Sequence, residues 1–339
     1  MRDIEFGSTG FYPAFDGVRR AQLSESLGFD LQGFSENHSR ATDCFGEMRD
    51  AARGTSRIKL ACGPVNFVTR HPGVVAAGII PIQILSGGRA ICNLATGDSA
   101  VAAAGMPRQR IADMERDMII LRTYLDRGVV AYENGKTSRL EWADNLDWPY
   151  LPIQMAASGP KAIALAARRA DRICLGVGAN PHRVRWALDI IDEELARTGR
   201  DREAMRVGMF LPIAITDDRA SGRKAIRTRV SGFAHMQSGV GTDLSQQPEI
   251  LRKVTAWMRD NYDYSFHRPD APPENPNTAV IDEDFGDWMG IGGPVSYCLD
   301  RMGELVGLGI DFFITALHQP AEREVYSAEV MPAVRKVRG

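Results

Sequence analysis

The sequence has few of the features that mark membrane proteins, nucleic-acid-binding proteins and secreted proteins. Its longest apolar stretch, residues 74–85, is interrupted by Pro81 and Gln83 and is too short to cross a bilayer. The formal net charge of −2 offers no electrostatic attraction for nucleic acid or for an anionic membrane. Residues 1–5 contain no apolar leader. We therefore expect a cytoplasmic protein that acts on a small-molecule substrate, with no nucleic acid and no membrane as partner.

Cysteine and histidine are scarce, and their spacing excludes two further classes. The five cysteines are odd in number and form no C-x-x-C pair, and the six histidines lack the spacing of metal ligands. This pattern argues against a disulfide framework and against a zinc site, so we expect no metal. No G-x-G-x-x-G follows the first apolar run, which removes the best positive indication of a dinucleotide-binding fold.

The chain does contain a regular alternation of short apolar runs and amphipathic segments, which is typical of a parallel sheet wrapped by helices. With 339 residues, 44% of them hydrophobic, it can bury a barrel-sized core. Eight strand–helix units running in one direction predict an α/β fold of the TIM (β/α)8 type, not an open doubly wound sheet. The predicted strands are residues 4–8, 31–35, 58–62, 90–95, 153–157, 172–176, 207–215 and 310–315.

The interval between the seventh and eighth predicted strands is too long for a simple crossover. It contains two helical patterns, at 219–237 and 249–262, and a loop rich in proline and asparagine at 269–277. We interpret residues 217–309 as a helical insertion within a single barrel domain that covers residues 1–339.

Functional groups of such a barrel collect at the carboxyl ends of the strands and in the loops that follow. Small and polar residues recur at these positions. They are Ser35-Glu36-Asn37-His38 after the second strand, Gly63-Pro64-Val65-Asn66 after the third, Thr96-Gly97-Asp98-Ser99 after the fourth, Ser158-Gly159-Pro160-Lys161 after the fifth and Val177-Gly178-Ala179-Asn180 after the sixth.

The segment from Ser158 to Lys161 has the clearest features of a binding device. Ser158 can cap the following helix, Pro160 suits its first turn, and Gly159 lets a ligand approach the backbone. Free N–H groups at a helix start attract an anion, although a helix start that binds nothing has the same sequence. Gly176-Val177-Gly178 at the next strand end adds a second glycine-lined wall. Together the two segments predict a phosphate site.

Three residues are candidates for chemistry. His38 is the best single candidate for acid–base work, because histidine alone titrates near neutrality without help; the alternative is a structural hydrogen bond. Asp98 can carry a proton, and its neighbours Thr96, Gly97 and Ser99 can bind a phosphate or ribityl chain, although any turn can have this composition. Cys62, at the end of the third strand, can approach a bound ring or serve as a small buried hydrophobic residue.

Residues 60–72, LACGPVNFVTRHP, resemble the third-strand segment of bacterial-luciferase-like flavin-dependent oxidoreductases, a superfamily that includes deazaflavin-dependent methylene-tetrahydromethanopterin reductases. Four further matches occur in the order expected of the family: residues 27–30 with 34–36, 85–90 with 96–100, 152–161, and 291–294 with 308–311. The resemblance implies a barrel that holds FMN, or the deazaflavin coenzyme F420, at the strand ends. It also implies a cis bond between Gly63 and Pro64, where many relatives have a non-prolyl cis peptide. The cofactor contacts implied are Cys62, Gly63, Pro64 and Asn66 near the ring, and Thr96, Gly97, Ser99, Ser158, Gly159, Gly176, Val177 and Gly178 near the phosphate end.

The chain departs from the family after the second strand. Relatives usually have histidine directly after the acid, whereas here Asn37 lies between Glu36 and His38. Either His38 keeps the catalytic role or Asn37 takes it as a neutral donor, so the catalytic candidates are Glu36, Asn37, His38 and Asp98.

Our leading hypothesis is a two-component monooxygenase that receives reduced FMN from a separate flavin reductase. The first alternative is hydride transfer with F420, which the reductase-like residues 96–100 and 158–161 favour. The second, from another class, is a non-catalytic flavin-binding barrel. Because dimers are common in the superfamily, the resemblance also implies a homodimer.

Overall fold

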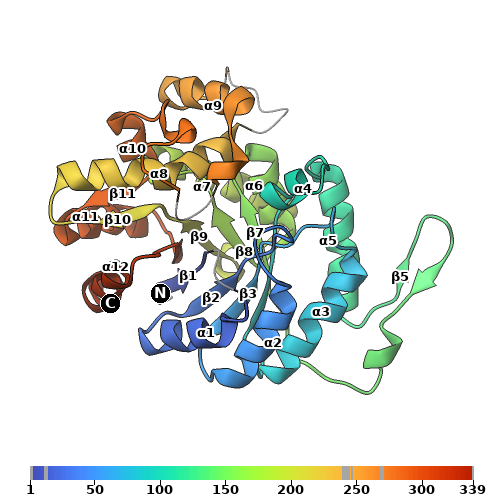
Figure 1. The fold of residues 1–339 in the computed structure, drawn as a ribbon. Coiled ribbons are helices and arrows are strands. Elements are labelled where there is room, and N and C mark those ends of the chain that lie inside the picture. Colours follow the sequence, from blue (N-terminus) through green and yellow to red (C-terminus); the bar gives the residue numbers. More distant parts are fainter. Residues whose placement is uncertain (1–2, 11–13, 239–244, 246, 268–270, 338–339) are drawn as a thin grey trace.

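The computed structural model of the chain describes residues 3–10, 14–238, 245, 247–267 and 271–337. Within these residues, eight parallel strands close into a barrel in the order β1-β12-β9-β8-β7-β4-β3-β2, with helices around it (Figure 1). The predicted (β/α)8 barrel is therefore confirmed. The barrel strands are β1 (Glu5–Ser8), β2 (Leu31–Phe34), β3 (Lys59–Cys62), β4 (Ala90–Leu94), β7 (Ile153–Ala157), β8 (Arg172–Leu175), β9 (Arg206–Phe210) and β12 (Phe312–Thr315).

The helices of the outer layer begin and end at residues suited to those positions. Proline occupies the first turn of α3, α6 and α7, where its missing N–H is not needed. Gly199 ends α7 in the left-handed conformation. These helices are α1 (Gly17–Ser26), α2 (Cys44–Gly54), α3 (Pro72–Leu85), α5 (Ile111–Leu125), α6 (Pro160–Arg169), α7 (Pro181–Thr198), α11 (Val295–Gly307), α12 (Pro320–Val325) and α13 (Met331–Lys336), and the short α4 (Ser99–Ala103) follows β4.

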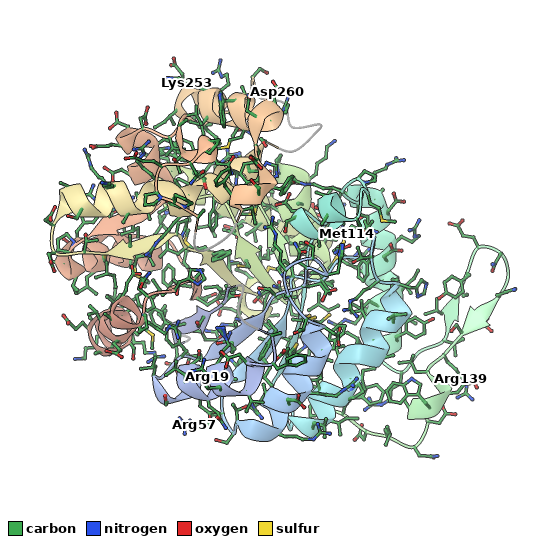
Figure 2. All side chains as sticks on the ribbon, in the orientation of Figure 1. Arg19, Arg57, Met114, Arg139, Lys253 and Asp260 are labelled. Carbon is green, nitrogen blue, oxygen red and sulfur yellow. The ribbon has the colours of Figure 1, made fainter. Side chains whose placement is uncertain are left out.

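Two apolar layers hold the barrel together. The larger layer lies between the strands and the helices, and Met114 of α5 is one of its buried members (Figure 2). The smaller layer fills the barrel interior and consists of Leu31, Ala61, Ile91, Cys174, Phe312 and Ile314. Neighbouring residues of a strand face opposite sides of the sheet, so Cys62 faces the helices while Ala61 faces the interior. Among the described residues, no helix is both long and apolar enough to cross a membrane.

An ionic network closes the amino end of the barrel. Glu5 of β1 accepts hydrogen bonds from Arg172 (2.8 Å), Lys59 and Arg206. Burial alone raises the pKa of the Glu5 carboxyl, but the three cations outweigh burial and lower it to about 2. This end of a (β/α)8 barrel serves stability and not catalysis, so we expect the network to hold the fold.

The predicted seventh strand, residues 207–215, is not continuous. It breaks at Pro212, which has no N–H to give to a neighbouring strand. β9 ends before the break and stays in the barrel, whereas β10 (Ile213–Ile215) leaves it and pairs with β11 (Ile291–Gly293). The chain thus leaves the barrel earlier than the apolar run indicates.

The segment between β10 and β11 builds a second apolar core above the barrel (Figure 1). Its helices are α8 (Arg219–Gln237), α9 (Glu249–Asn261) and α10 (Glu283–Met289). Lys253 and Asp260 lie on the outer face of α9 (Figure 2). The interval 217–309 also includes α11, whose buried residues Cys298 and Met302 belong to the barrel core.

Candidate functional site

The third strand ends in a bulge at the mouth of the barrel. The Gly63–Pro64 bond is cis, as predicted, and Gly63 has a positive φ of 69°. The chain rejoins the sheet at Val65, whose N–H donates to the Asn93 carbonyl at 2.9 Å. A Cβ at position 63 would overlap the backbone nitrogen of Val65, so only glycine fits. The bulge presents backbone and a proline ring toward the mouth, without a long side chain.

Asn37, and not His38, points inward after the second strand. Asn37 is 1% exposed; its Nδ2 donates to Ser99 Oγ at 3.0 Å, and its Oδ1 accepts from Ser39 Oγ at 2.8 Å. It therefore ties the loop after β2 to the start of α4. The His38 side chain is exposed and forms no hydrogen bond or ion pair with any described residue. Asn37 is thus buried with both polar atoms engaged inside the protein, and the catalytic roles predicted for Asn37 and His38 both stay predictions.

Glu36 is engaged in an ion pair. Arg70 Nε donates to its Oε1 at 2.7 Å and Nη2 to its Oε2 at 3.2 Å, while the same Nη2 donates to Asp43 Oδ1 at 2.6 Å. Burial would lower the pKa of Arg70, but these two carboxylates outweigh it and raise the pKa. Cys44 lies beside Glu36 and Asp43 in a group with the spacing of metal ligands, yet both carboxylates already accept hydrogen bonds from the Arg70 guanidinium. Glu36 thus fixes the loop after β2.

Asp98, at the start of α4, is held by three donors, two of which belong to the segment between β10 and β11. Its Oδ1 accepts from Arg108, from His235 Nε2 at 3.1 Å and from the Tyr264 hydroxyl at 3.1 Å. Burial would raise the pKa of Asp98, but the hydrogen bond from His235 and the charge of Arg108 outweigh it and lower the pKa. Asp98 is therefore a fixed anion near neutral pH. It can accept hydrogen bonds and stabilise a cation, but it is a poor proton donor.

Rings from the helical segment above the barrel pack over Asp98. His235 of α8 stacks on Tyr262 with centroids 3.9 Å apart, and Tyr264 stands edge-on to it at 5.2 Å. Burial raises the pKa of Tyr264 to about 12 and lowers that of His267 to about 4, so both are neutral at pH 7. His235 Nδ1 is buried and has no hydrogen-bond partner among the described residues. Sequence reasoning missed these rings, although three of them lie within the six residues 262–267.

A second polar region forms where β7 and β8 end. Gly176 N–H donates to the Ala157 carbonyl at 2.9 Å, and a Cβ on Gly176 would lie 3.8 Å from Ser158 Cβ. The N-cap of α6 is Gly159, which has no side chain to cap the helix, and a Cβ built on it would meet nothing within 4 Å. Among the described residues, the first N–H groups of α6 therefore have no side-chain acceptor. The structure brings Ser158, Gly159 and Gly176 together, as the predicted phosphate site requires.

Other expected contacts are corrected by the structure. Ser158 does not cap α6, because the helix begins one residue later than that role needs. Cys62 is 0% exposed on the helix side of the sheet, and Val177 is buried in the same core. Gly178 packs against the segment above the barrel, since a Cβ there would lie 2.5 Å from Met289 Sδ. Cys62, Val177 and Gly178 are accordingly removed from the cofactor contacts.

The remaining candidates shape their loops. Asn66 Oδ1 accepts from the N–H groups of Val68 (3.1 Å) and Thr69 (2.9 Å), which folds the turn after the bulge. The Thr96 carbonyl accepts from Gln109 N–H at 2.9 Å, and Gly97 turns the chain toward α4 with a positive φ. These residues position Asp98 and Ser99 at the barrel mouth.

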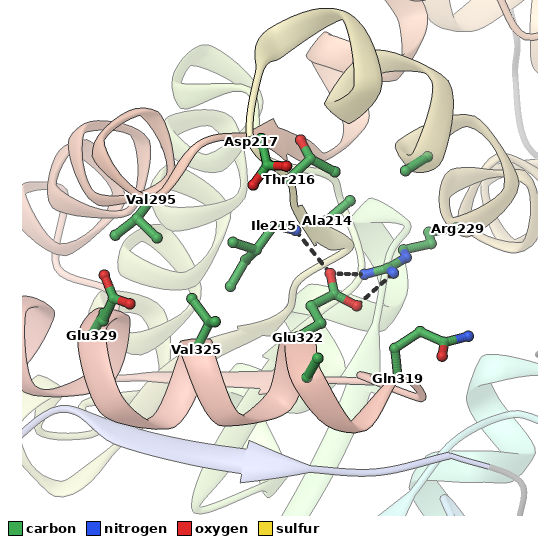
Figure 3. A pocket seen from close by; sticks show the side chains of 12 residues that line it. Ala214, Ile215, Thr216, Asp217, Arg229, Val295, Gln319, Glu322, Val325 and Glu329 are labelled. Atoms are coloured by element: carbon green, nitrogen blue, oxygen red, sulfur yellow. Dashed lines mark hydrogen bonds and ion pairs between the residues drawn. The ribbon is translucent and has the colours of Figure 1, made fainter.

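A cavity of about 510 Å³ lies elsewhere, between β10 and α12 (Figure 3). Glu322 crosses it, accepting from the Ile215 N–H at 2.8 Å and from two Arg229 nitrogens at 2.7 Å each. Glu322 and Arg229 form an ion pair, and none of the strand-end candidates lines this cavity. We therefore place the candidate site at the strand ends.

Comparison with known proteins gives consistent matches over most of the chain. A family model described as luciferase-like monooxygenase matches residues 8–311. A 5,10-methylenetetrahydromethanopterin reductase from Archaeoglobus fulgidus is 24% identical over 291 residues, covering 85% of each chain. A putative coenzyme F420-dependent oxidoreductase from Mycobacterium tuberculosis is 27% identical over 247 residues, covering 66% of this chain and 69% of that one. The solved structure of a coenzyme F420 dependent tetrahydromethanopterin reductase from Methanopyrus kandleri superposes with a TM-score of 0.74 at 20% identity, covering 98% and 99% of the two chains.

Proposed function

The chain belongs to the luciferase-like monooxygenase family, and from this premise we propose that it is an oxidoreductase that uses the deazaflavin coenzyme F420 to exchange a hydride with a small organic substrate. The names of its relatives support this alternative better than the FMN-dependent monooxygenase that the sequence analysis preferred. A separate flavin reductase belongs only to the FMN hypothesis. The homodimer stays a prediction.

The residues at the strand ends fit such a coenzyme, and one observation carries the assignment. Among the described residues, the start of α6 has a glycine N-cap, no side-chain cap and nothing within 4 Å of a Cβ built on Gly159, and it lies beside Ser158 and Gly176. A helix start of this kind attracts a phosphate, and the coenzyme carries one on its side chain. The Gly63–Pro64 bulge is the segment that would meet its ring. When bound, the deazaflavin supplies a two-electron hydride carrier.

His235 and Asp98 are suited to handle the proton that accompanies the hydride. His235 Nε2 lies 3.1 Å from Asp98 Oδ1, 2.8 Å from the Tyr264 hydroxyl and 3.3 Å from Arg108 Nη2. In the tautomer whose Nε2–H donates to the Asp98 carboxylate, Nδ1 is a buried acceptor with no partner among the described residues. Uptake of a proton at Nδ1 creates an imidazolium that the Asp98 carboxylate stabilises. Tyr262 and Tyr264 keep water from the ring by stacking on it and closing its edge. In this proposal Asp98 orients the base and His235 moves the proton.

The test is a comparison of two coenzymes on the same purified protein. We expect F420 to bind, seen as a change in its fluorescence, and FMN to bind at least tenfold more weakly. Under anaerobic conditions, reduced F420 should then be oxidised by a small carbonyl or imine substrate. Binding of FMN alone, with oxygen consumed when it is reduced, would restore the monooxygenase. Binding of F420 with no turnover across a broad substrate panel would favour the non-catalytic barrel.

A further inference from the structure

Gln154 carries a buried hydrogen-bond donor that no described residue satisfies. It lies on β7 and is 0% exposed, and its Oε1 accepts from Arg172 Nε at 3.1 Å. This contact fixes the amide, because a flipped amide would place one N–H group against another. The other end of the amide is therefore Nε2, which is buried and has no acceptor among the described residues. A buried N–H group without an acceptor costs stability, so we expect an acceptor beside it.

This donor lies inside the barrel, near its amino end. Ile153 and Met155, the neighbours of Gln154 on β7, pack against the helices, so the Gln154 side chain points into the barrel. In the sheet Gln154 lies beside Arg172 of β8. The guanidinium carbon of Arg172 is 4.4 Å from the ring centroid of Phe312, which belongs to the apolar layer of the interior. Because that layer separates Gln154 from the barrel mouth, a ligand here must be small and must enter from the amino end.

The ionic network around Glu5 places a surplus of positive charge at the same end of the barrel. Lys59 and Arg172 both donate to the Glu5 carboxylate, at 2.5 and 2.8 Å. Among the described residues, neither cation has a second carboxylate within 4 Å. Two cations therefore share one anion, even before Arg206 is counted, which donates to Glu5 as well. Positive charge beside a buried N–H group favours an anion over a water molecule as the acceptor.

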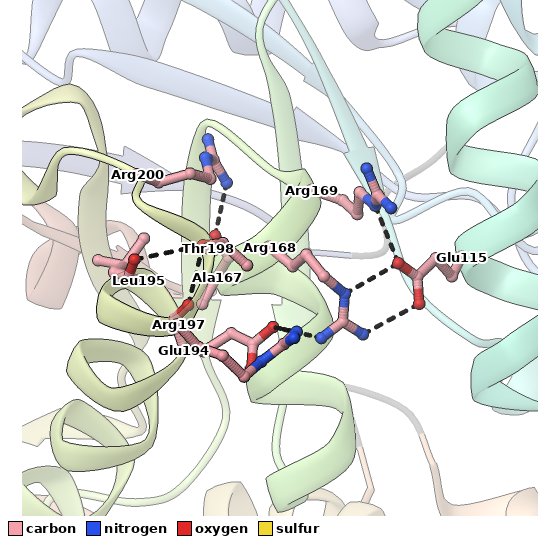
Figure 4. A network of polar contacts seen from close by, with 9 residues as sticks. All are labelled: Glu115, Ala167, Arg168, Arg169, Glu194, Leu195, Arg197, Thr198 and Arg200. Carbon is pink, nitrogen blue, oxygen red and sulfur yellow. Dashed lines mark hydrogen bonds and ion pairs between the residues drawn. The ribbon is translucent and has the colours of Figure 1, made fainter.

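A network on the outer surface shows how water compensates a similar surplus (Figure 4). Arg168 and Arg169 both donate to Glu115. Arg168 also donates to Glu194, which accepts from Arg197 too. Three arginines thus share two carboxylates, but the side chains of Arg169 and Arg197 are 41% and 62% exposed. Solvent surrounds the extra charge there, so this network needs no further anion.

We propose that the amino end of the barrel binds a small monovalent anion, of the size of chloride, held by Gln154 Nε2–H, Arg172 and Lys59. The Arg172 side chain is only 6% exposed, so water cannot surround its charge as it does on the outer surface. Lys59 is partly exposed and joins the site to solvent. The site is independent of the coenzyme and lies at the opposite end of the barrel. Because the anion binds the folded barrel, raising its concentration stabilises the fold.

The experiment compares the Tm of the wild type in sodium chloride and in sodium gluconate at equal ionic strength, since gluconate is too large for the site. We expect Tm to be about 2–4 °C higher in chloride, as one weakly bound anion predicts. Gln154→Glu replaces the N–H group with a carboxylate oxygen and so supplies the negative charge itself. In gluconate this variant should melt at or above the Tm of the wild type, and chloride should add nothing.

Gln32→Glu is the matched control at a second buried glutamine. Its Oε1 accepts from Ser24 Oγ and its Nε2 donates to the Gly33 carbonyl, at 2.7 Å each, so both ends of this amide are satisfied. We expect Gln32→Glu to lower Tm in both salts and to keep the response to chloride. A higher Tm of Gln32→Glu in gluconate would show that the gain in Gln154→Glu does not come from the anion site.

Crystals of the wild type grown in sodium bromide test the same site without any variant, and they decide the question if Gln154→Glu does not fold. We expect an anomalous bromide peak within hydrogen-bond distance of Gln154 Nε2. Three results would overturn the anion site: an equal Tm of the wild type in chloride and gluconate, an undiminished chloride response in Gln154→Glu, or no bromide beside Gln154.

Discussion

The open start of α6 makes Gly159→Asp the sharpest test of how the coenzyme is held. The backbone of Gly159 has an ordinary φ of −101°, and its missing Cβ faces open space, so the side chain can be accommodated. Aspartate is a preferred N-cap, and replacing a glycine cap changes helix stability by only a few tenths of a kcal/mol. The new carboxylate would accept from the same N–H groups that we assign to the phosphate. The variant therefore removes the anion site while keeping the helix.

The size of the effect follows from the hydrogen bonds lost. Each bond from a helix N–H to a phosphate contributes about 1.5–3 kcal/mol, and losing one or two of them weakens binding roughly 100-fold. Gly159→Asn is the control, because asparagine caps the helix without adding charge. We expect a loss of about tenfold for asparagine and a larger one for aspartate, measured as the Kd of F420 by fluorescence titration with Tm recorded alongside. If Gly159→Asp binds F420 as tightly as the wild type does, the phosphate does not lie at this helix start.

Three further predictions concern other parts of the molecule. Glu5→Gln should lower the free energy of unfolding by about 3 kcal/mol at pH 7, because the pKa of the Glu5 carboxyl is lowered to about 2 in the folded protein. This stability is present above pH 4.5 and is lost as the pH falls toward 2, so the difference in unfolding free energy between wild type and variant, measured with urea, should shrink in acid. An equal loss in Glu193→Gln, at an exposed position, would contradict this expectation. His235→Asn should reduce turnover at least 100-fold with little change in coenzyme Kd, whereas equal turnover loss in His38→Asn would return the catalytic role to His38. Gly178→Ala should lower Tm, because its φ of 86° and its packing disfavour a Cβ; weaker coenzyme binding at unchanged Tm would restore it to the phosphate site.

Features that depend on nearby residues could be predicted from the sequence. The strand β7 and the helix α8 have the bounds that the apolar pattern predicts, residues 153–157 and 219–237. The seventh strand was predicted too long, because its apolar run continues through Pro212 while the ladder cannot. The cis bond after Gly63 came from the family resemblance and not from local pattern.

The site was harder to predict because it is assembled from contacts between distant positions. Asp98 meets His235, 137 residues away, and Gly178 meets Met289 of α10. No local pattern indicates either contact, so a glycine that packs against a helix looked the same as a glycine that faces a phosphate. The backbone conformation of the turn after β2 decides which side chain, Asn37 or His38, points inward, and composition does not determine that conformation.

The last turn of α8 joins the two halves of the candidate site. His235 reaches Asp98 after β4, and Gln237, two residues on, donates to the Gly176 carbonyl after β8. Residues two apart on a helix point in nearly opposite directions, so the helix end must lie between these two strand ends to make both contacts. The last turn of α8 therefore carries the histidine proposed to move the proton and contacts Gly176, which belongs to the proposed phosphate site. This gives a physical reason for the long segment between β10 and β11: it brings His235, the residue proposed to move the proton, to Asp98, which is held as an anion.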